Sequence, residues 1–99
     1  MNLQQLRYLN EIVRQGLNIS GAASALYTSQ PGISKQIRQL EEELGIEIFV
    51  RNGKRIVAIT EPGKAVLAIA QRMLHDAENL KQAAQEFHAQ DSGNLTIAT

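Results

Sequence analysis

The feature that most constrains the fold is an apolar repeat in the second half of the chain. After Thr60-Glu61-Pro62, which reads as a capped helix start, apolar residues recur at alternating spacings of four and three, the heptad pattern of a helix that packs along another helix. A helix over residues 61–88 would be about 40 Å long at about 1.5 Å per residue, more than the preceding domain can cover. The seam positions are Val66, Ala70, Met73, Ala77, Leu80, Ala84 and Phe87.

Large and small side chains alternate along this seam. An alanine separates each large residue from the next, so a large residue of one helix can sit over an alanine of a second helix. The second helix is most simply the same helix of another copy of the chain. The pattern therefore predicts an antiparallel homodimer.

Length and composition set outer limits on the fold and its partners. The chain has 99 residues, enough for one small domain with an appendage, and 10 Lys and Arg balance 10 Asp and Glu. Because the net charge is zero, a polyanionic partner must be argued from where the cations lie. The lack of cysteine removes disulfides and thiolate metal sites, and no apolar run approaches the roughly 18 residues of a membrane span. We expect a cytoplasmic protein without membrane contact.

Three short amphipathic helices are predicted in the first half. Apolar residues at helical spacing indicate a helix over residues 3–15, and Asn18 offers an N-cap oxygen to a short second helix. Pro31 suits the first turn of a third helix, and Gly45 stands where that helix should end. Because only a brief turn separates the second and third helices, the pattern is typical of a helix-turn-helix.

A β-hairpin is predicted after the third helix. Apolar residues alternate on both sides of Asn52-Gly53, a pair typical of tight hairpin turns, and three cations flank that pair. The fold class is therefore mainly α: a winged helix-turn-helix of three helices and a two-stranded β wing, followed by a long dimerisation helix. The alternating apolar residues are Ile46, Ile48, Val50, Ile56 and Ala58.

The chain divides into three parts on this interpretation. Residues 1–60 form the winged helix-turn-helix domain, and residues 61–89 form the linker and dimerisation helix. Residues 90–99 form a hinge and the start of a further domain, because Leu95-Thr96-Ile97 begins an alternating strand that has nothing to pair against.

The third helix separates an apolar face from a basic, hydrogen-bonding face. On a helical wheel Ile33 and Ile37 lie on one side, whereas Lys35 and Arg38 lie on the other. The acidic run Glu41–Glu43, interpreted as a solvated helix end, comes only in the third turn. The donor-rich end is thus the N-terminal one, where the helix dipole also favours an anion.

The side chains at this N-terminal end can read DNA. Gln30 can hydrogen-bond two edge atoms of adenine, and Pro31 can touch a thymine methyl group. Lys35 and Arg38 can donate to guanine or to phosphate, and Ser34 can contact either a base or the backbone.

Further contacts are expected from residues on either side of this helix. Arg51, Lys54 and Arg55 of the hairpin would project towards the minor groove or the flanking backbone. Thr28 and Ser29 are secondary candidates, since they suit helix caps as well as phosphate contacts. Each group taken alone also fits a solvated surface, but their combination favours a DNA-binding surface that is locally positive on a neutral chain.

Four stretches of the sequence match a pattern known from one family. They are LQQLRYLNEIV at the front, GAASALYTSQPGISKQIRQLEEELGIEIFVR in the middle, TEPG at the start of the long helix, and GNLTIA at the end. With these stretches the chain resembles the LysR-type transcriptional regulators. Together with the R-x-G-K wing, the middle stretch is most similar to the subgroup that contains the cysteine-regulon activator CysB.

The resemblance implies a role, a set of partners and a set of site residues. It implies the DNA-binding front part of a bacterial regulator that pairs its long helices antiparallel and binds double-stranded DNA as a dimer of dimers. Gln30, Pro31, Ser34 and Lys35 would read the major groove, and Lys54 or Arg55 would enter the minor groove. Many members carry arginine at the position of Lys35, and lysine lacks the rigid fork of arginine. No cofactor is implied for this fragment, whereas a small-molecule inducer would bind a domain beyond it.

Two other classes of function remain as comparisons. A winged helix can also serve as a protein-interaction and dimerisation module that binds no DNA. An enzyme would need a phosphate loop or a nucleophile with its base, and the sequence offers neither. His75 and His88 lie several turns apart on the long helix, so we predict no metal site and no catalytic residue. The aromatic residues Tyr8, Tyr27 and Phe49 are interpreted as core residues.

Overall fold

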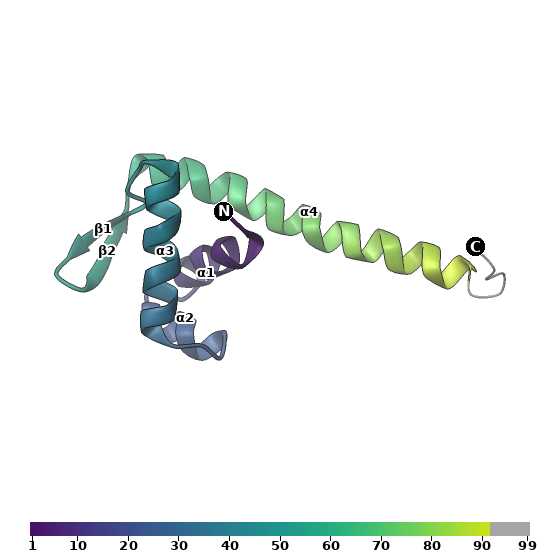
Figure 1. Cartoon of the computed structure of the whole chain (residues 1–99), viewed down its shortest axis with the longest axis horizontal. Coiled ribbons are helices and arrows are strands. Elements are labelled where there is room, and N and C mark those ends of the chain that lie inside the picture. Colours follow the sequence, from purple (N-terminus) through teal and green to yellow (C-terminus); the bar gives the residue numbers. More distant parts are fainter. Residues whose placement is uncertain (92–99) are drawn as a thin grey trace.

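A three-helix head with a β-hairpin and one long helix make up the molecule (Figure 1). The computed structural model describes residues 1–91, and side chains as far as His88. The predicted class, a mainly α winged helix-turn-helix followed by a long helix, is confirmed. The elements in chain order are α1 (Leu3–Arg14), α2 (Ile19–Ala25), α3 (Gln30–Leu44), β1 (Phe49–Asn52), β2 (Arg55–Ile59) and α4 (Glu61–Asp91).

The helix ends follow the capping residues of the sequence. Asn18 accepts a hydrogen bond from the backbone N–H of Gly21 at 3.1 Å, and Ser29 accepts one from Gly32 at 3.1 Å. Each of these side chains satisfies a backbone donor that the first turn of a helix leaves free. Helix α3 ends at Gly45, whose φ of 70° is left-handed.

Helix α1 lies at the centre of the core and contacts α2, α3 and α4. Burying one leucine or isoleucine side chain in this core stabilises the fold by about 1.5–3 kcal/mol. Phe49, at the start of the wing, is fully buried in the same cluster, so the wing is anchored to the head through its first residue. The most buried aliphatic side chains are Leu6, Leu9, Ile12, Ile33, Ile37, Leu40 and Ile48.

The wing differs from its prediction in register. Asn52 pairs with Arg55, so the two turn residues are Gly53 and Lys54, and not Asn52-Gly53. Gly53 has a φ of 64°, which glycine adopts without strain. The alternation also predicts that Val50 shares a buried face with Ile48, and this is wrong. The strand pairing shifts between Val50 and Arg51, and Val50 is 44% exposed.

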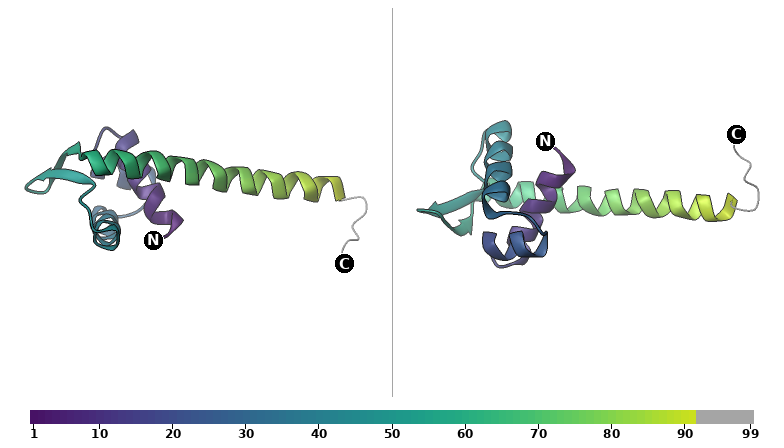
Figure 2. Two further views of the ribbon diagram at one scale, coloured as in Figure 1. Left: turned by 90° about the horizontal axis from the view of Figure 1, so that it is seen from above. Right: turned by 60° about the horizontal axis from the view of Figure 1, so that its bottom comes forward.

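Helix α4 packs on the head along its first half, as far as Leu74 (Figure 2). Ala70 is 2% exposed and lies in the core with Val66 packed against it. Asn10 of α1 accepts a hydrogen bond from Gln71 at 3.1 Å. No helix within residues 1–91 is both long enough and apolar enough to cross a membrane.

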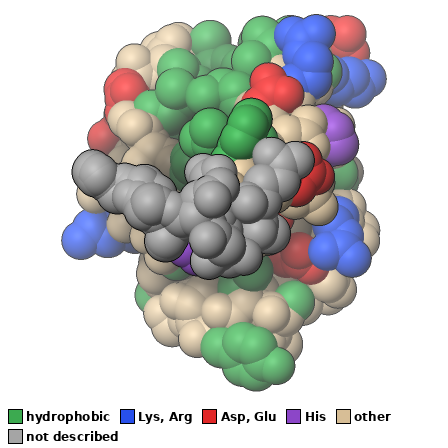
Figure 3. Space-filling model, turned by 90° about the vertical axis from the view of Figure 1, so that its right-hand side faces the viewer, with side chains coloured by type: hydrophobic (Ala, Val, Ile, Leu, Met, Phe, Trp, Pro, Cys, Tyr) green, Lys and Arg blue, Asp and Glu red, His purple; other side chains and the backbone are tan. Residues whose placement is uncertain are grey.

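The predicted seam of α4 is therefore split, and its assignment is corrected at Ala70. That side chain is covered by its own chain, so it is not available to a second copy. From residue 69 onwards α4 also carries exposed apolar side chains, including Ile69, which the heptad count omits. In Figure 3, seen from the C-terminal side, hydrophobic side chains gather on the upper part of the face. The exposed stripe consists of Ile69, Met73, Leu80, Ala84 and Phe87.

Two further sequence interpretations are wrong. Tyr27 is 96% exposed with a φ of 55°, because it follows the last turn of α2 in a left-handed conformation that turns its ring away from the core. Glu41 is 6% exposed and is not part of a solvated helix end. Tyr8 packs against the core, as expected. Of the predicted hinge and strand start, residues 92–99 lie outside the described residues, and residues 90 and 91 still belong to α4.

Candidate nucleic-acid interface

The first two turns of α3 present polar side chains to solvent. Gln30, Pro31, Lys35 and Arg38 are exposed, and Ser34 is half-buried. Pro31, Lys35 and Arg38 project away from Ile33 and Ile37, which the core buries completely or nearly so. Gln30 and Ser34 lie at the border of the two sides, next to Ile37. The N-terminal end of α3 is thus fixed by its buried apolar side and exposes its polar side to solvent.

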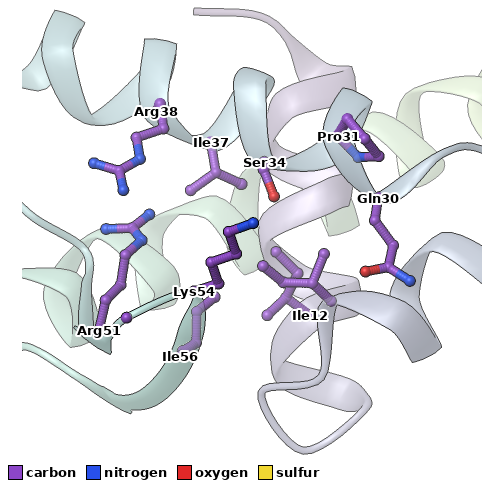
Figure 4. A pocket seen from close by; sticks show the side chains of 11 residues that line it. Ile12, Gln30, Pro31, Ser34, Ile37, Arg38, Arg51, Lys54 and Ile56 are labelled. Atoms are coloured by element: carbon purple, nitrogen blue, oxygen red, sulfur yellow. The ribbon is translucent and has the colours of Figure 1, made fainter.

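A groove of about 630 Å³ runs between this face of α3 and the wing (Figure 4). Its sides are polar, and its floor is apolar because side chains of α1, α2, α3 and β2 reach up from the core. Residues of α3 and of the hairpin, which are distant in sequence, therefore line the same groove. The groove is lined by Ile12, Ile19, Gln30, Pro31, Ser34, Ile37, Arg38, Arg51, Gly53, Lys54 and Ile56.

A second hollow of about 420 Å³ continues the groove past the wing towards the start of α2. It shares Gln30 and Lys54 with the first groove and adds Arg55, Asn18 and Ser20. The two hollows together form one cleft between the hairpin and the helix-turn-helix. The part of its lining near α2 carries no charged side chain, and its cations come from the wing and from α3.

The cations of the cleft differ in how free they are. Lys54 leans across the groove towards Ser34 (Figure 4). Within the described residues, Arg38, Lys54 and Arg55 form no ion pair with a carboxylate. They are available to an anion, as is Lys35 on the outer side of α3.

Arg51 is the exception among the predicted wing cations. Its guanidinium donates to both carboxylate oxygens of Glu41, at 2.9 and 3.2 Å, and its side chain is only 16% exposed. Glu41 also accepts hydrogen bonds from the backbone N–H groups of Ile48 and Phe49. Arg51 thus lines the groove and also neutralises a buried carboxylate, and its role as a DNA contact stays a prediction.

Nothing in the described part of the chain offers a metal site. No group of three or more histidine, aspartate or glutamate side chains that could hold a metal ion occurs there. The chemistry of the cleft is that of hydrogen-bond donors and positive charge over an apolar floor. Such a surface suits a phosphodiester backbone with base edges beside it.

Comparison with known families decides what kind of chain this is. Residues 3–64 match the family described as "Bacterial regulatory helix-turn-helix protein, lysR family". The chain belongs to the LysR family. The matched residues include all three helices of the head, the whole wing and the first turn of α4.

Two curated LysR-family relatives align over almost the entire chain. SsuR of Burkholderia cenocepacia is 58% identical over 99 residues, which cover 100% of this chain and 32% of SsuR. CysB of the same organism is 56% identical over 98 residues, which cover 99% of this chain and 31% of CysB. Both are described as HTH-type transcriptional regulators. The chain spans about a third of the length of these relatives.

Solved LysR-family structures have the same architecture. The complex of CbnR_DBD with DNA superposes with a TM-score of 0.78 at 32% identity, covering 87% of this chain and 97% of that chain. The complex of BenM_DBD with benA site 1 DNA has a TM-score of 0.80 at 30% identity, covering 88% of this chain and 96% of that chain. Both neighbours were therefore solved with DNA bound.

The sequence interpretation of this LysR-family chain missed two residues that line the cleft and one exposed residue outside its lining. Asn18 and Ser20 line the second hollow, although the sequence marks Asn18 only as a helix cap. Tyr27 stands exposed just before α3, and its left-handed φ gives no signal in the sequence. Thr28 is half-buried, whereas Ser29 is exposed and its hydroxyl oxygen caps α3.

Proposed function

We propose that this chain is the DNA-binding and dimerising part of a LysR-type transcriptional regulator. The observation that carries the proposal is the shared groove, in which the exposed edge of α3 faces Lys54, a cation that forms no ion pair with the described residues. The DNA complexes of two similar domains support it. The proposal includes sequence-specific binding, and it places the protein in the cytoplasm, where bacterial DNA lies.

The reading role falls to the N-terminal half of α3. We assign Gln30, Pro31, Ser34 and Lys35 to the major groove, because they form the exposed or half-exposed edge of the helix. A recognition helix that enters the major groove has its first residues at the base edges. The apolar face of α3, held in the core, fixes the direction in which these side chains point.

The wing supplies contacts to the neighbouring minor groove. If α3 lies in one groove and the hairpin in the next, the sugar–phosphate strand between the two grooves must pass through the cleft. Lys54 and Arg38 flank that path, and neither forms an ion pair in the part of the chain that the structure describes. We therefore assign these two side chains to phosphates, which leaves Arg55 as the cation for the minor groove.

The exposed stripe of α4 supplies the dimer. Leu80 is 72% exposed and Phe87 is 66% exposed, and side chains of this size are seldom left in water in a continuous row. A second copy of α4 running antiparallel would cover them. Further parts of the proposal rest on the family resemblance of the sequence alone: a tetramer in the longer protein, control of sulfur or cysteine genes, and a small-molecule inducer bound outside this chain.

Selection of DNA from a random pool tests the function directly. The purified chain should enrich an inverted repeat, since two copies related by two-fold symmetry read two half-sites. Affinity for that site should fall with salt at a log–log slope of about −0.9 per phosphate contact. A protein-interaction module would enrich no sequence, and that result would favour the alternative function.

A further inference from the structure

Ile48 joins the recognition helix to the long helix through its own backbone. Its N–H donates to a carboxylate oxygen of Glu41, on α3, at 2.7 Å. Its carbonyl oxygen accepts from the backbone N–H of Thr60, the residue before α4, at 2.9 Å. One residue of the segment before β1 therefore bridges the C-terminal half of α3 and the start of α4.

Thr60 secures the α4 side of this bridge. Its hydroxyl donates to the carbonyl oxygens of Glu47 and Ile48, and the same oxygen accepts from the backbone N–H of Gly63 at 2.9 Å. The threonine thus caps the first turn of α4 and fastens that turn to the segment before β1. Serine could make the same contacts, whereas valine could make none of them.

Gly63 allows the two segments to approach closely. A Cβ atom at this position would lie 2.3 Å from the carbonyl oxygen of Ile48, a distance at which the backbone must move. Gly63 has no positive φ, so close approach is the reason for glycine here. The first turn of α4 is in direct contact with the bridge.

Glu41 secures the α3 side. Its carboxylate is buried and also accepts hydrogen bonds from Phe49 and Arg51, so the base of the wing is held by the same group. We call Glu41, Ile48, Thr60 and Gly63 the Ile48 junction. None of these four residues lines the cleft between α3 and the wing.

The angle at this junction is amplified by the length of α4. A helix of 31 residues is about 46 Å long, so a change of about 10° at its start displaces its far end by about 8 Å. Successive bases in duplex DNA lie about 3.4 Å apart along one strand, so that displacement corresponds to about two base pairs. In an antiparallel pair of α4 helices, the two heads are carried on opposite ends of the pair.

We propose that the Ile48 junction fixes the angle between α3 and α4 and thereby selects the spacing of the two DNA half-sites. Glu41, Thr60 and Gly63 are positioning residues in this scheme, since they touch no DNA and act through the placement of α3. The inference rests on the proposed function, because it requires a DNA-binding dimer. Sequence preference within a half-site belongs to α3 and is separate from it.

The test compares binding to one half-site with binding to pairs of half-sites at varied spacing. Gly63→Ala and Thr60→Val should bind a single half-site within about twofold of the unmodified chain, because the cleft is unchanged. Their preference for the best spacing over one displaced by a base pair should fall about tenfold, or the optimum should move. Thr60→Ser, which keeps the hydroxyl, should restore the original profile.

A matched control separates positioning from stability. Ile33→Val shortens a fully buried side chain away from the junction, so it lowers stability and should keep the original spacing profile. If Thr60→Val or a folded Gly63→Ala keeps the original profile, or if Ile33→Val changes it equally, the inference is overturned. If the unmodified chain selects no paired half-sites, the proposed function fails and the inference fails with it.

Discussion

Arg51 and Glu41 form a two-pronged ion pair that ties the wing to the recognition helix. The guanidinium nitrogens lie 2.9 and 3.2 Å from the carboxylate oxygens, and the side chains are 16% and 7% exposed. A bidentate arginine–carboxylate contact fixes orientation as well as distance. The pair therefore holds β1 at a set position beside α3, and the groove between them keeps its width.

Arg51→Ala should destabilise the fold markedly. Removing one partner leaves the Glu41 carboxylate buried with only backbone donors, so we expect the free energy of unfolding to fall by about 3 kcal/mol. Urea denaturation followed by circular dichroism measures the change. Arg55→Ala is the control, since Arg55 is exposed and should change stability by less than about 0.5 kcal/mol. Equal losses in the two variants would contradict a structural role for Arg51.

Tyr27→Gly should stabilise the fold. A left-handed conformation costs a residue with a side chain about 1–2 kcal/mol, and the exposed ring of Tyr27 returns little packing energy. After the greater chain entropy of glycine is subtracted, the net gain should be about 0.5–1 kcal/mol, seen as a higher melting temperature.

The control for Tyr27→Gly is a substitution by glycine at a helical position. Ser24 is exposed near the end of α2, so Ser24→Gly should lower stability by about 0.5 kcal/mol. If both variants lost stability, the left-handed residue would carry no strain, and the physical argument for Tyr27 would be wrong.

Local chemistry explains why the helices of this chain could be predicted. Asn18, Ser29 and Gly45 satisfy helix ends through atoms within a few residues, so the sequence around each end contains the whole interaction. The basic edge of α3 follows in the same way from helical spacing. These features need no knowledge of the rest of the fold.

The remaining features depend on contacts between distant segments. Glu41 is buried because the segment before β1 supplies backbone donors, and a run of three glutamates gives no sign of that. Ala70 is buried because α4 crosses α1, which the heptad pattern alone does not reveal. The wing turn shifted by one residue because pairing of Asn52 with Arg55 overrode the usual preference of the Asn-Gly pair.

Leu80→Glu should dissociate the dimer and leave the head folded. Leu80 is 72% exposed in the single chain, so a charge there disturbs no core contact but would be buried against a second α4. Sedimentation velocity should show a monomer at a concentration where the unmodified chain is a dimer. Gln82→Glu, at an exposed position on the opposite side of α4, should leave the dimer intact. If the Leu80→Glu variant remained a dimer, the exposed stripe of α4 would not form the dimer interface.

Gln30→Ala should weaken sequence-specific binding and relax the preference for one base. Gln30 is exposed at the first residue of α3 and lines both parts of the cleft. A glutamine that contacts an adenine edge with two hydrogen bonds contributes about 1–3 kcal/mol of discrimination. Competition binding with sites altered one base at a time measures the loss and locates it.

Arg55→Ala separates base reading from charge. It should weaken binding to all sequences alike and reduce the salt slope by about one unit, because a phosphate or minor-groove cation adds affinity with little sequence information. Gln39→Ala, an exposed glutamine on the same helix but outside the cleft, should bind as the unmodified chain does. If Gln30→Ala instead showed a uniform loss with its base preference intact, the N-terminal edge of α3 would not be the reading surface.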